Sequence, residues 1–206
     1  MDTNLFIQKI HKRKALIRPR IIVCIPFGVT EVEKRAVRDA ALNAGARWAR
    51  LIEEPMAAAI GVDLPVHEPS GNMIIDIGGG TTEVAVISLG GIVTALSIRV
   101  GGDELDQAII DWVKREYSLL LGERTAEEIK IAIGSISPGR ERLQTPVRGR
   151  DLVTGLPREI MITDQDVRNA IGHSIEELVE SIKEVIEQTP PEILADVMQR
   201  GIYLAG

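Results

Sequence analysis

The residues best suited to chemistry gather around one run of glycines, Asp76-Ile77-Gly78-Gly79-Gly80-Thr81. Adjacent glycines let backbone amides approach an anion closely, because no Cβ stands in the way. The hydroxyl of Thr81 supplies a further donor. Asp76 suits a hydrated Mg²⁺ better than direct phosphate contact, because two anions repel each other unless a cation lies between them. The run predicts a phosphate site with a metal ion beside it, and the alternative is an ordinary glycine-rich turn next to a solvated aspartate.

The elements on either side of the glycines decide what kind of phosphate loop this could be. The patterns of residues 73–77, 82–88 and 92–100 each predict a strand. Walker and Rossmann loops lie between a strand and a helix, whereas these glycines join two strands. The sequence therefore predicts a phosphate turn within a β-meander.

An α/β unit comes before the meander. The aliphatic run at 21–25 predicts a strand that is covered on both faces. Thr30, with a glutamate three residues later, predicts a helix start with a capping box. Because Cys24 lies within the aliphatic run, we expect a buried and inert thiol. We also expect Trp48 and Trp112 to belong to the core.

Two helix starts after the meander carry candidate ligands. Gly101-Gly102 comes before a helix for which we expect Asp103 to be the N-cap. Thr125 is expected to cap a shorter helix, on which Glu127 and Lys130 face the same side. The alternative for this pair is a solvated ion pair three residues apart, which contributes a few tenths of a kcal/mol.

Composition narrows the possible functions. The chain has 206 residues, 24 basic against 30 acidic, a formal net charge of -6 and 3% aromatic residues. Net acidity and few aromatic rings argue against nucleic-acid binding, which uses basic faces and stacking. The longest uncharged stretch, 84–98, is interrupted by glycines and is too short to span a bilayer. No signal-peptide pattern opens the chain, so the cytoplasm is the expected compartment.

The opening segment suggests a contact with lipid. Leu16 and Ile17 lie among the basic residues Lys12, Arg13, Lys14, Arg18 and Arg20. Large aliphatic side chains ringed by positive charge suit an anionic membrane surface. The alternative is that Leu16 and Ile17 pack on their own helix.

Three segments together resemble a known superfamily: DIGGGTTEVAV at 76–86, LIEEPMAAAIG at 51–61 and VGGDELD at 100–106. They are similar to the actin-type ATPases, and within these to the bacterial rod-shape-determining actin homologues, the MreB family. The resemblance covers nearly the whole chain. It implies an incomplete two-domain α/β fold of the actin-like, ribonuclease H-like kind. Residues 1–60 would belong to the first domain and 70–206 to the second, with 104–165 as an inserted subdomain.

The resemblance also implies roles at an ATP and Mg²⁺ site. Glu54 would orient the attacking water with the help of Thr81, although a carboxylate at a helix start is also a common capping arrangement. Asp76 would hold Mg²⁺ through water. Residues implied to contact the nucleotide are Gly78, Gly79, Gly80 and Thr81 at the phosphates, Gly101 and Gly102 from the following segment, Glu127 and Lys130 at the ribose and adenine, and Gly206 in the adenosine loop.

At the level of function, the resemblance implies a filament-forming ATPase that directs cell shape and cell-wall synthesis. Its expected partners are further copies of itself, the inner face of the cell membrane and the cell-wall elongation machinery. One alternative is a chaperone ATPase of the heat-shock type, whose nucleotide domain shares the glycine run and the E-P-x-A-A-A pattern. Another is a sugar or acetate kinase, which would need an acceptor-binding aspartate and a sugar pocket that the sequence does not reveal.

The chain also departs from the family pattern. The family's first phosphate loop, D-x-G-T, does not occur before Lys9, and further glycines would follow Gly206. We therefore expect either an internal segment of a longer polypeptide or a truncated gene product. Such a chain is expected to bind ATP weakly or not at all, with slow hydrolysis confined to the full-length protein. We further expect an open sheet edge that is prone to aggregation.

Overall fold

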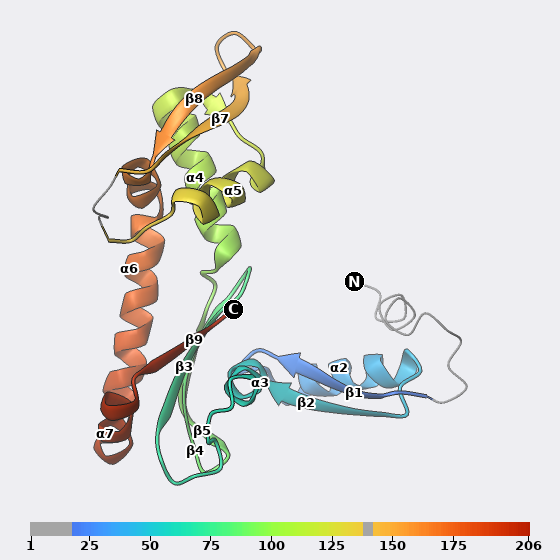
Figure 1. Cartoon of the computed structure of the whole chain (residues 1–206). Coiled ribbons are helices and arrows are strands. Elements are labelled where there is room, and N and C mark those ends of the chain that lie inside the picture. The colour runs from blue at the N-terminus through green and yellow to red at the C-terminus, as the bar shows by residue number, and fades with distance from the viewer. Residues whose placement is uncertain (1–17, 138–141) are drawn as a thin grey trace. The chain divides into compact units, whose positions relative to one another are not determined.

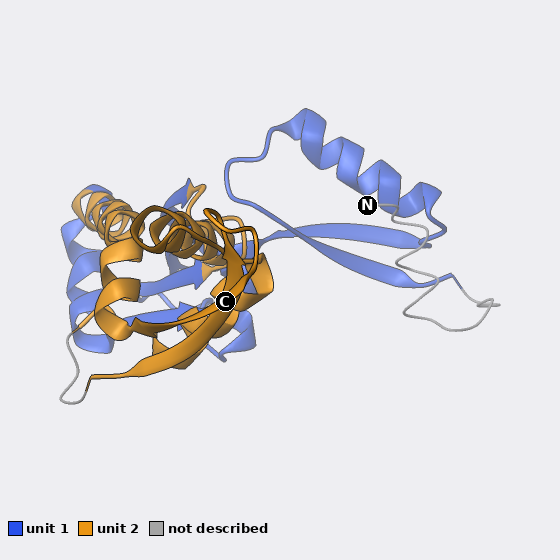
Figure 2. Ribbon diagram, turned by 90° about the horizontal axis from the view of Figure 1, so that it is seen from above, with its two compact units in different colours: residues 1–76, 83–97, 188–205 blue, residues 77–82, 98–187, 206 orange. Residues whose placement is uncertain are grey.

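The computed structural model describes residues 18–137 and 142–206 (Figure 1). The expectations for the opening segment, including Leu16 and Ile17, lie outside these residues. The chain forms two compact units, coloured separately in Figure 2. Among the described residues, unit 1 comprises 18–76, 83–97 and 188–205, and unit 2 comprises 77–82, 98–137, 142–187 and 206. The domain boundaries expected from the sequence stay predictions.

Unit 1 begins with an α/β pair. Strands β1 (Arg20–Ile25) and β2 (Trp48–Glu53) run parallel, with a register that ends at Ile25 opposite Glu53. Helix α2 (Glu31–Asn43) connects them. The expected capping box is confirmed, since the Thr30 side chain accepts from the Glu33 amide while the Glu33 carboxylate accepts from the Thr30 amide. Helix α3 (Glu54–Gly61) follows β2 directly.

The predicted meander forms the larger sheet of unit 1. Strands β3 (Asn72–Ile77), β4 (Thr82–Ser88) and β5 (Gly91–Ile98) are joined by β9 (Ile202–Ala205) in the order β5-β4-β3-β9. Strand β9 runs parallel to β3 and follows α7 (Pro191–Arg200). One core cluster unites α3, the segment after it and this sheet, and its buried members are Ala59, Leu64, Val66, Ile74, Ala85 and Ile87.

The prediction that β1 is covered on both faces is wrong. Burial alternates along the strand, Ile22 is 67% exposed and Cys24 is exposed. Trp48 lies on β2 opposite Arg20 of β1 and is also exposed. The guanidinium carbon of Arg50 lies 5.0 Å from the centre of the Trp48 ring. The reason is that β1 and β2 form a two-stranded sheet whose side chains alternate, so only one face can lie against α2. The expected burial of Cys24 and Trp48 is therefore wrong as well.

Unit 2 contains the helices α4 (Gly102–Tyr117), α5 (Glu123–Ile133) and most of α6 (Asp164–Gln188). They pack with an antiparallel sheet of β6 (Leu119–Leu120), β7 (Gln144–Asp151) and β8 (Pro157–Thr163), in the order β6-β7-β8. Trp112 packs against the buried core of this unit, as expected. The predicted cap at Thr125 is wrong, because α5 begins at Glu123 with Gly122 as its N-cap.

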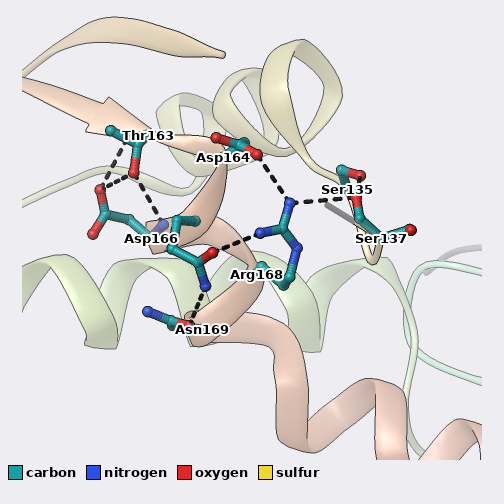
Figure 3. A network of polar contacts seen from close by, with 8 residues as sticks. Ser135, Ser137, Thr163, Asp164, Asp166, Arg168 and Asn169 are labelled. Atoms are coloured by element: carbon teal, nitrogen blue, oxygen red, sulfur yellow. Dashed lines mark hydrogen bonds and ion pairs between the residues drawn. The ribbon is translucent and has the colours of Figure 1, made fainter. Parts of the chain in front are cut away.

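A polar network fixes the start of α6 (Figure 3). The carboxylate of Asp166 accepts from the Thr163 amide at 3.0 Å and from its hydroxyl at 2.6 Å. Arg168 pairs with Asp164 at 2.9 Å and donates to the Ser137 carbonyl at 3.3 Å, which ties the helix to the segment after α5. Within the described part of the chain, no helix is both long and apolar enough to cross a membrane.

Candidate functional site

The glycine turn after β3 is held by its carbonyl groups. The Gly78 amide donates to the Thr81 carbonyl at 2.8 Å and closes the turn. The Gly102 amide donates to the Gly78 carbonyl at 2.9 Å, and the Asp103 amide donates to the Gly79 carbonyl at 2.8 Å. The first amides of α4 are therefore bonded to the turn, and α4 begins where the turn places it.

This docking corrects one prediction. Asp103 is not the N-cap of α4, because Gly101 occupies that position with an extended backbone and no side-chain cap is present. The amide of Asp103 instead points at the Gly79 carbonyl, so Asp103 already lies inside the first helical turn. The helix end is satisfied by the carbonyls of the glycine turn in place of a capping side chain.

Three glycine segments that are far apart in the sequence meet at this turn. A Cβ on Gly101 would lie 2.5 Å from the Gly79 carbonyl oxygen and 2.6 Å from that of Gly78. A Cβ on Gly206 would collide with the Ile77 carbonyl. Only glycine allows such approaches between backbones. The structure thus brings the predicted residues Gly78 to Gly80, Gly101, Gly102 and Gly206 together within unit 2.

Two backbone amides of the same turn, unlike its carbonyls, are not used in bonds within the protein. Gly79 and Gly80 are exposed, and neither donates any hydrogen bond recorded among the described residues. Thr82, just after the turn, is buried with its hydroxyl donating to the Val100 carbonyl at 2.6 Å, so it cannot serve a ligand. The carbonyls of Gly78 and Gly79 are occupied while the exposed amides of Gly79 and Gly80 are not, and such a turn is suited to binding an anion.

Lys130 has protein partners instead of an open position. Its ammonium group lies 2.9 Å from an Asp106 oxygen and donates to the Gly102 carbonyl at 3.0 Å. Glu127 is exposed and forms no ion pair with Lys130, so the alternative of a simple pair between them is wrong. Lys130 connects α5 to the first residue of α4, beside the glycine turn. Its contact with ribose or adenine stays a prediction.

Carboxylates gather in unit 1 where β2 and β3 end. Glu54 is the first residue of α3, and Asp76 is the last residue of unit 1 on β3. Partial burial raises the pKa of Glu54, and the negative charge of Asp76 raises it further. The charge of Asp76 thus disfavours the ionised form of Glu54, and a cation or a proton would relieve that repulsion.

The described residues contain no group of three or more His, Cys, Asp or Glu side chains arranged to hold a metal ion. A Mg²⁺ ion keeps several waters and takes one or two carboxylates together with the phosphates of its ligand. Asp76 fits such a water-mediated role by its chemistry.

Sequence reasoning missed Glu83. This residue on β4 is 1% exposed, and its carboxylate accepts a hydrogen bond from the Phe27 amide at 3.0 Å. The available signal was a single charge inside an otherwise apolar strand with the sequence TEVAVIS. Such a charge is costly to bury and marks a position with a specific partner.

Cys24 does not add a nucleophile to these carboxylates. Partial burial raises the pKa of its thiol, and the charges of Glu54 and Asp76 raise it further. The thiol is exposed yet protonated at neutral pH, and a thiol is a poor nucleophile in comparison with a thiolate.

Comparison with known proteins places this arrangement. The crystal structure of MreB5 of Spiroplasma citri bound to ADP superimposes with a TM-score of 0.92 at 35% identity, covering 98% of this chain and 61% of that one. The MamK double helical filament matches with a TM-score of 0.79 at 20% identity, covering 99% of this chain and 60% of that one, a likeness of fold alone. The fold is therefore that of the actin-like proteins.

The sequence comparison is more specific. The profile of the MreB/Mbl protein family matches residues 3–206. The cell shape-determining protein MreB of Escherichia coli (strain K12) is 49% identical over 202 residues, which are 98% of this chain and 58% of that protein. The chain belongs to the MreB/Mbl family. It spans about three fifths of the length of the curated relatives it matches. The chaperone and kinase alternatives are not favoured.

Proposed function

We propose that the chain is the nucleotide-binding part of a filament-forming cytoskeletal protein that determines cell shape. The observation that carries this is the meeting of three glycine segments at the turn after Asp76. Carbonyls bonded to α4 leave the amides of Gly79 and Gly80 for an anion. The ADP and the AMPPNP named for the two Spiroplasma citri MreB5 structures supply the ligand class, an adenine nucleotide.

Magnetic resonance of the ¹⁵N-labelled chain tests this binding even where affinity is weak. Adding ATP with Mg²⁺ at millimolar concentration is expected to shift the amide signals of Gly79, Gly80 and Thr81, because those groups would lie against the phosphates. Adenosine, which lacks phosphates, is the matched control and should leave the three signals in place. Equal shifts with adenosine, or none with ATP, would contradict the phosphate site.

Hydrolysis is assigned to Glu54 and Thr81. Glu54 would orient a water molecule toward the terminal phosphate, with the Thr81 hydroxyl as second contact, while Asp76 holds Mg²⁺ through water. The metal ion, when bound, would neutralise charge on the phosphates. Phosphoryl transfer asks mainly for positioning and neutralisation, so these few groups suffice for slow turnover.

Replacing Glu54 by Gln tests its role. The substitution removes the charge that orients water but keeps the size of the side chain, so we expect phosphate release by the full-length protein in a single turnover to fall about 100-fold. The dissociation constant for ATP should change little, because Glu54 acts on water and not on the nucleotide. The exposed Glu31→Gln on α2 is the matched control. An unchanged rate for Glu54→Gln would remove the residue from the mechanism.

Assembly and location complete the proposal. Further copies of the chain would form filaments, which would lie at the inner face of the cell membrane and work with the cell-wall elongation machinery. Nucleotide-dependent pelleting at high speed tests self-association.

Co-sedimentation with anionic liposomes tests the lipid contact of Leu16 and Ile17. Replacing both residues by serine should abolish liposome binding, and undiminished binding would exclude that contact.

A further inference from the structure

Glu83 is a buried carboxylate that the proposed chemistry does not use. It lies at 1% exposure on β4, between Thr82 and Val84, which are both fully buried. Among the described residues, no lysine or arginine pairs with it. A valine would fill this strand position without burying a charge, so the carboxylate is present at a cost to stability. Its partners indicate what it contributes instead.

Those partners belong to segments far from Glu83 in the sequence. Both carboxylate oxygens face the Phe27 amide, at 3.0 and 3.3 Å, across 56 residues of sequence. The Ser97 hydroxyl on β5 donates to the same carboxylate at 3.3 Å. Glu83 thus joins the segment after β1 to the middle of the meander, and every group concerned belongs to unit 1.

Phe27 is connected to Glu54 through the paired ends of β1 and β2. Phe27 comes two residues after Ile25, the last residue of β1. Ile25 is registered opposite Glu53 on β2, and Glu54 is the next residue. Fixing the end of β1 on β4 therefore also fixes the end of β2, because the two strands are hydrogen-bonded as parallel neighbours.

We propose that Glu83 is a positioning residue whose carboxylate fastens the ends of β1 and β2 to the meander and so sets the place of Glu54 relative to Asp76. The inference rests on the proposed function, since only there does Glu54 act on water. Positioning matters for such a step, because a displacement of about 1 Å can slow a reaction about 100-fold.

The anchoring by Glu83 depends on an oxygen acceptor and not on a negative charge. Burial raises the pKa of Glu83, the bond from Phe27 lowers it, and the charges of Glu54 and Asp76 raise it again. The bond from the Phe27 amide requires only an oxygen acceptor. Glutamine offers that acceptor without a charge, whereas alanine offers none.

A distance measurement tests the anchoring without any need for catalysis. Cys24 is the only cysteine in the sequence and is exposed on β1. A second labelling site comes from Leu89→Cys, because Leu89 lies in the turn between β4 and β5 and is 71% exposed. Spin labels on this pair should give a narrow distance distribution in the parent and in Glu83→Gln. In Glu83→Ala the distribution should broaden at least twofold. An unchanged width in Glu83→Ala, or equal broadening in Glu83→Gln, would overturn the inference.

Single-turnover phosphate release supplies the functional readout. In the full-length protein, Glu83→Ala should release phosphate at least tenfold more slowly than the parent, with ATP affinity within about twofold, and Glu83→Gln should restore the rate. If the full-length parent neither binds nor hydrolyses ATP, the proposed function fails while the distance measurement still decides the anchoring. If Glu83→Ala does not fold, hydrogen exchange at the Phe27 amide of the parent decides it: strong protection supports the bond, and exchange at the rate of an open amide overturns it.

Discussion

Glu54 and Glu83 are carboxylates whose surroundings favour the protonated form. Burial is the first cause for both, and the charge of Asp76 adds to it in each case. Carboxylates with a pKa raised in this way are often found where they serve a ligand or hold a neighbouring element in place. For Glu54 we assign it to the water that attacks a nucleotide, and for Glu83 to the anchoring of β1.

The raised pKa of Glu83 predicts a dependence of stability on pH. The folded state holds this proton more tightly than the unfolded chain, whose glutamate pKa is near 4.5. The free energy of unfolding should therefore fall as pH rises from about 4.5 through the folded pKa. Glu83→Gln lacks this titration, so its stability should fall less over the same interval. Urea unfolding at a series of pH values measures the difference, and parallel curves for the two proteins would contradict it.

At the scale of elements, the start of α4 depends on the absence of a side chain at Gly101. Its Cβ would lie 2.5 Å from a backbone oxygen of the glycine turn, so Gly101→Ala must move the helix off the turn. We expect a loss of about 1–3 kcal/mol in unfolding free energy. The amide signals of Gly79 and Gly80 should also lose their response to ATP.

Gly61→Ala on α3 is the matched control for that substitution. No atom lies within 4 Å of the position its Cβ would take, and helical alanine is favoured over glycine. Thermal unfolding should therefore show unchanged or higher stability for Gly61→Ala. A Gly101→Ala protein as stable and as responsive as the parent would show that the close approach is dispensable.

Strand β9 is one of the two outer strands of the meander sheet, with Ile202 at 43% and Leu204 at 69% exposure. An exposed apolar edge strand offers free backbone groups to a second chain. Leu204→Lys should lower light scattering of the concentrated protein, because charge on an edge strand opposes pairing. The exposed Ile131→Lys on α5 is the control, and an equal reduction by that control would argue against the edge as the cause.

At the scale of the whole molecule, the chain consists of two units with separate apolar cores. Each unit contains one of the two tryptophans, Trp48 in unit 1 and Trp112 in unit 2. Trp112→Phe leaves Trp48 as the fluorescence reporter, and Trp48→Phe leaves Trp112. We expect the two reporters to show different urea midpoints, because separate cores can unfold in separate transitions. Coincident midpoints and slopes would indicate one cooperative body.

Local sequence determined much of this protein. The strands of the meander, the glycine turn, the capping box at Thr30 and the family resemblance all depend on residues that are near neighbours in the chain, and all are confirmed. Periodicity and turn chemistry act over a few residues, so they can be recognised without a structure.

Tertiary structure decided the rest. The exposure of Cys24 depends on what covers β1, the bond from Phe27 to Glu83 spans 56 residues, and the bond from Lys130 to Gly102 spans 28. The sequence marks Glu83 only as a charge in an apolar strand and is silent about its partner. A hydrogen-bond partner is set by which backbones the fold brings within about 3 Å, and no local pattern encodes that approach.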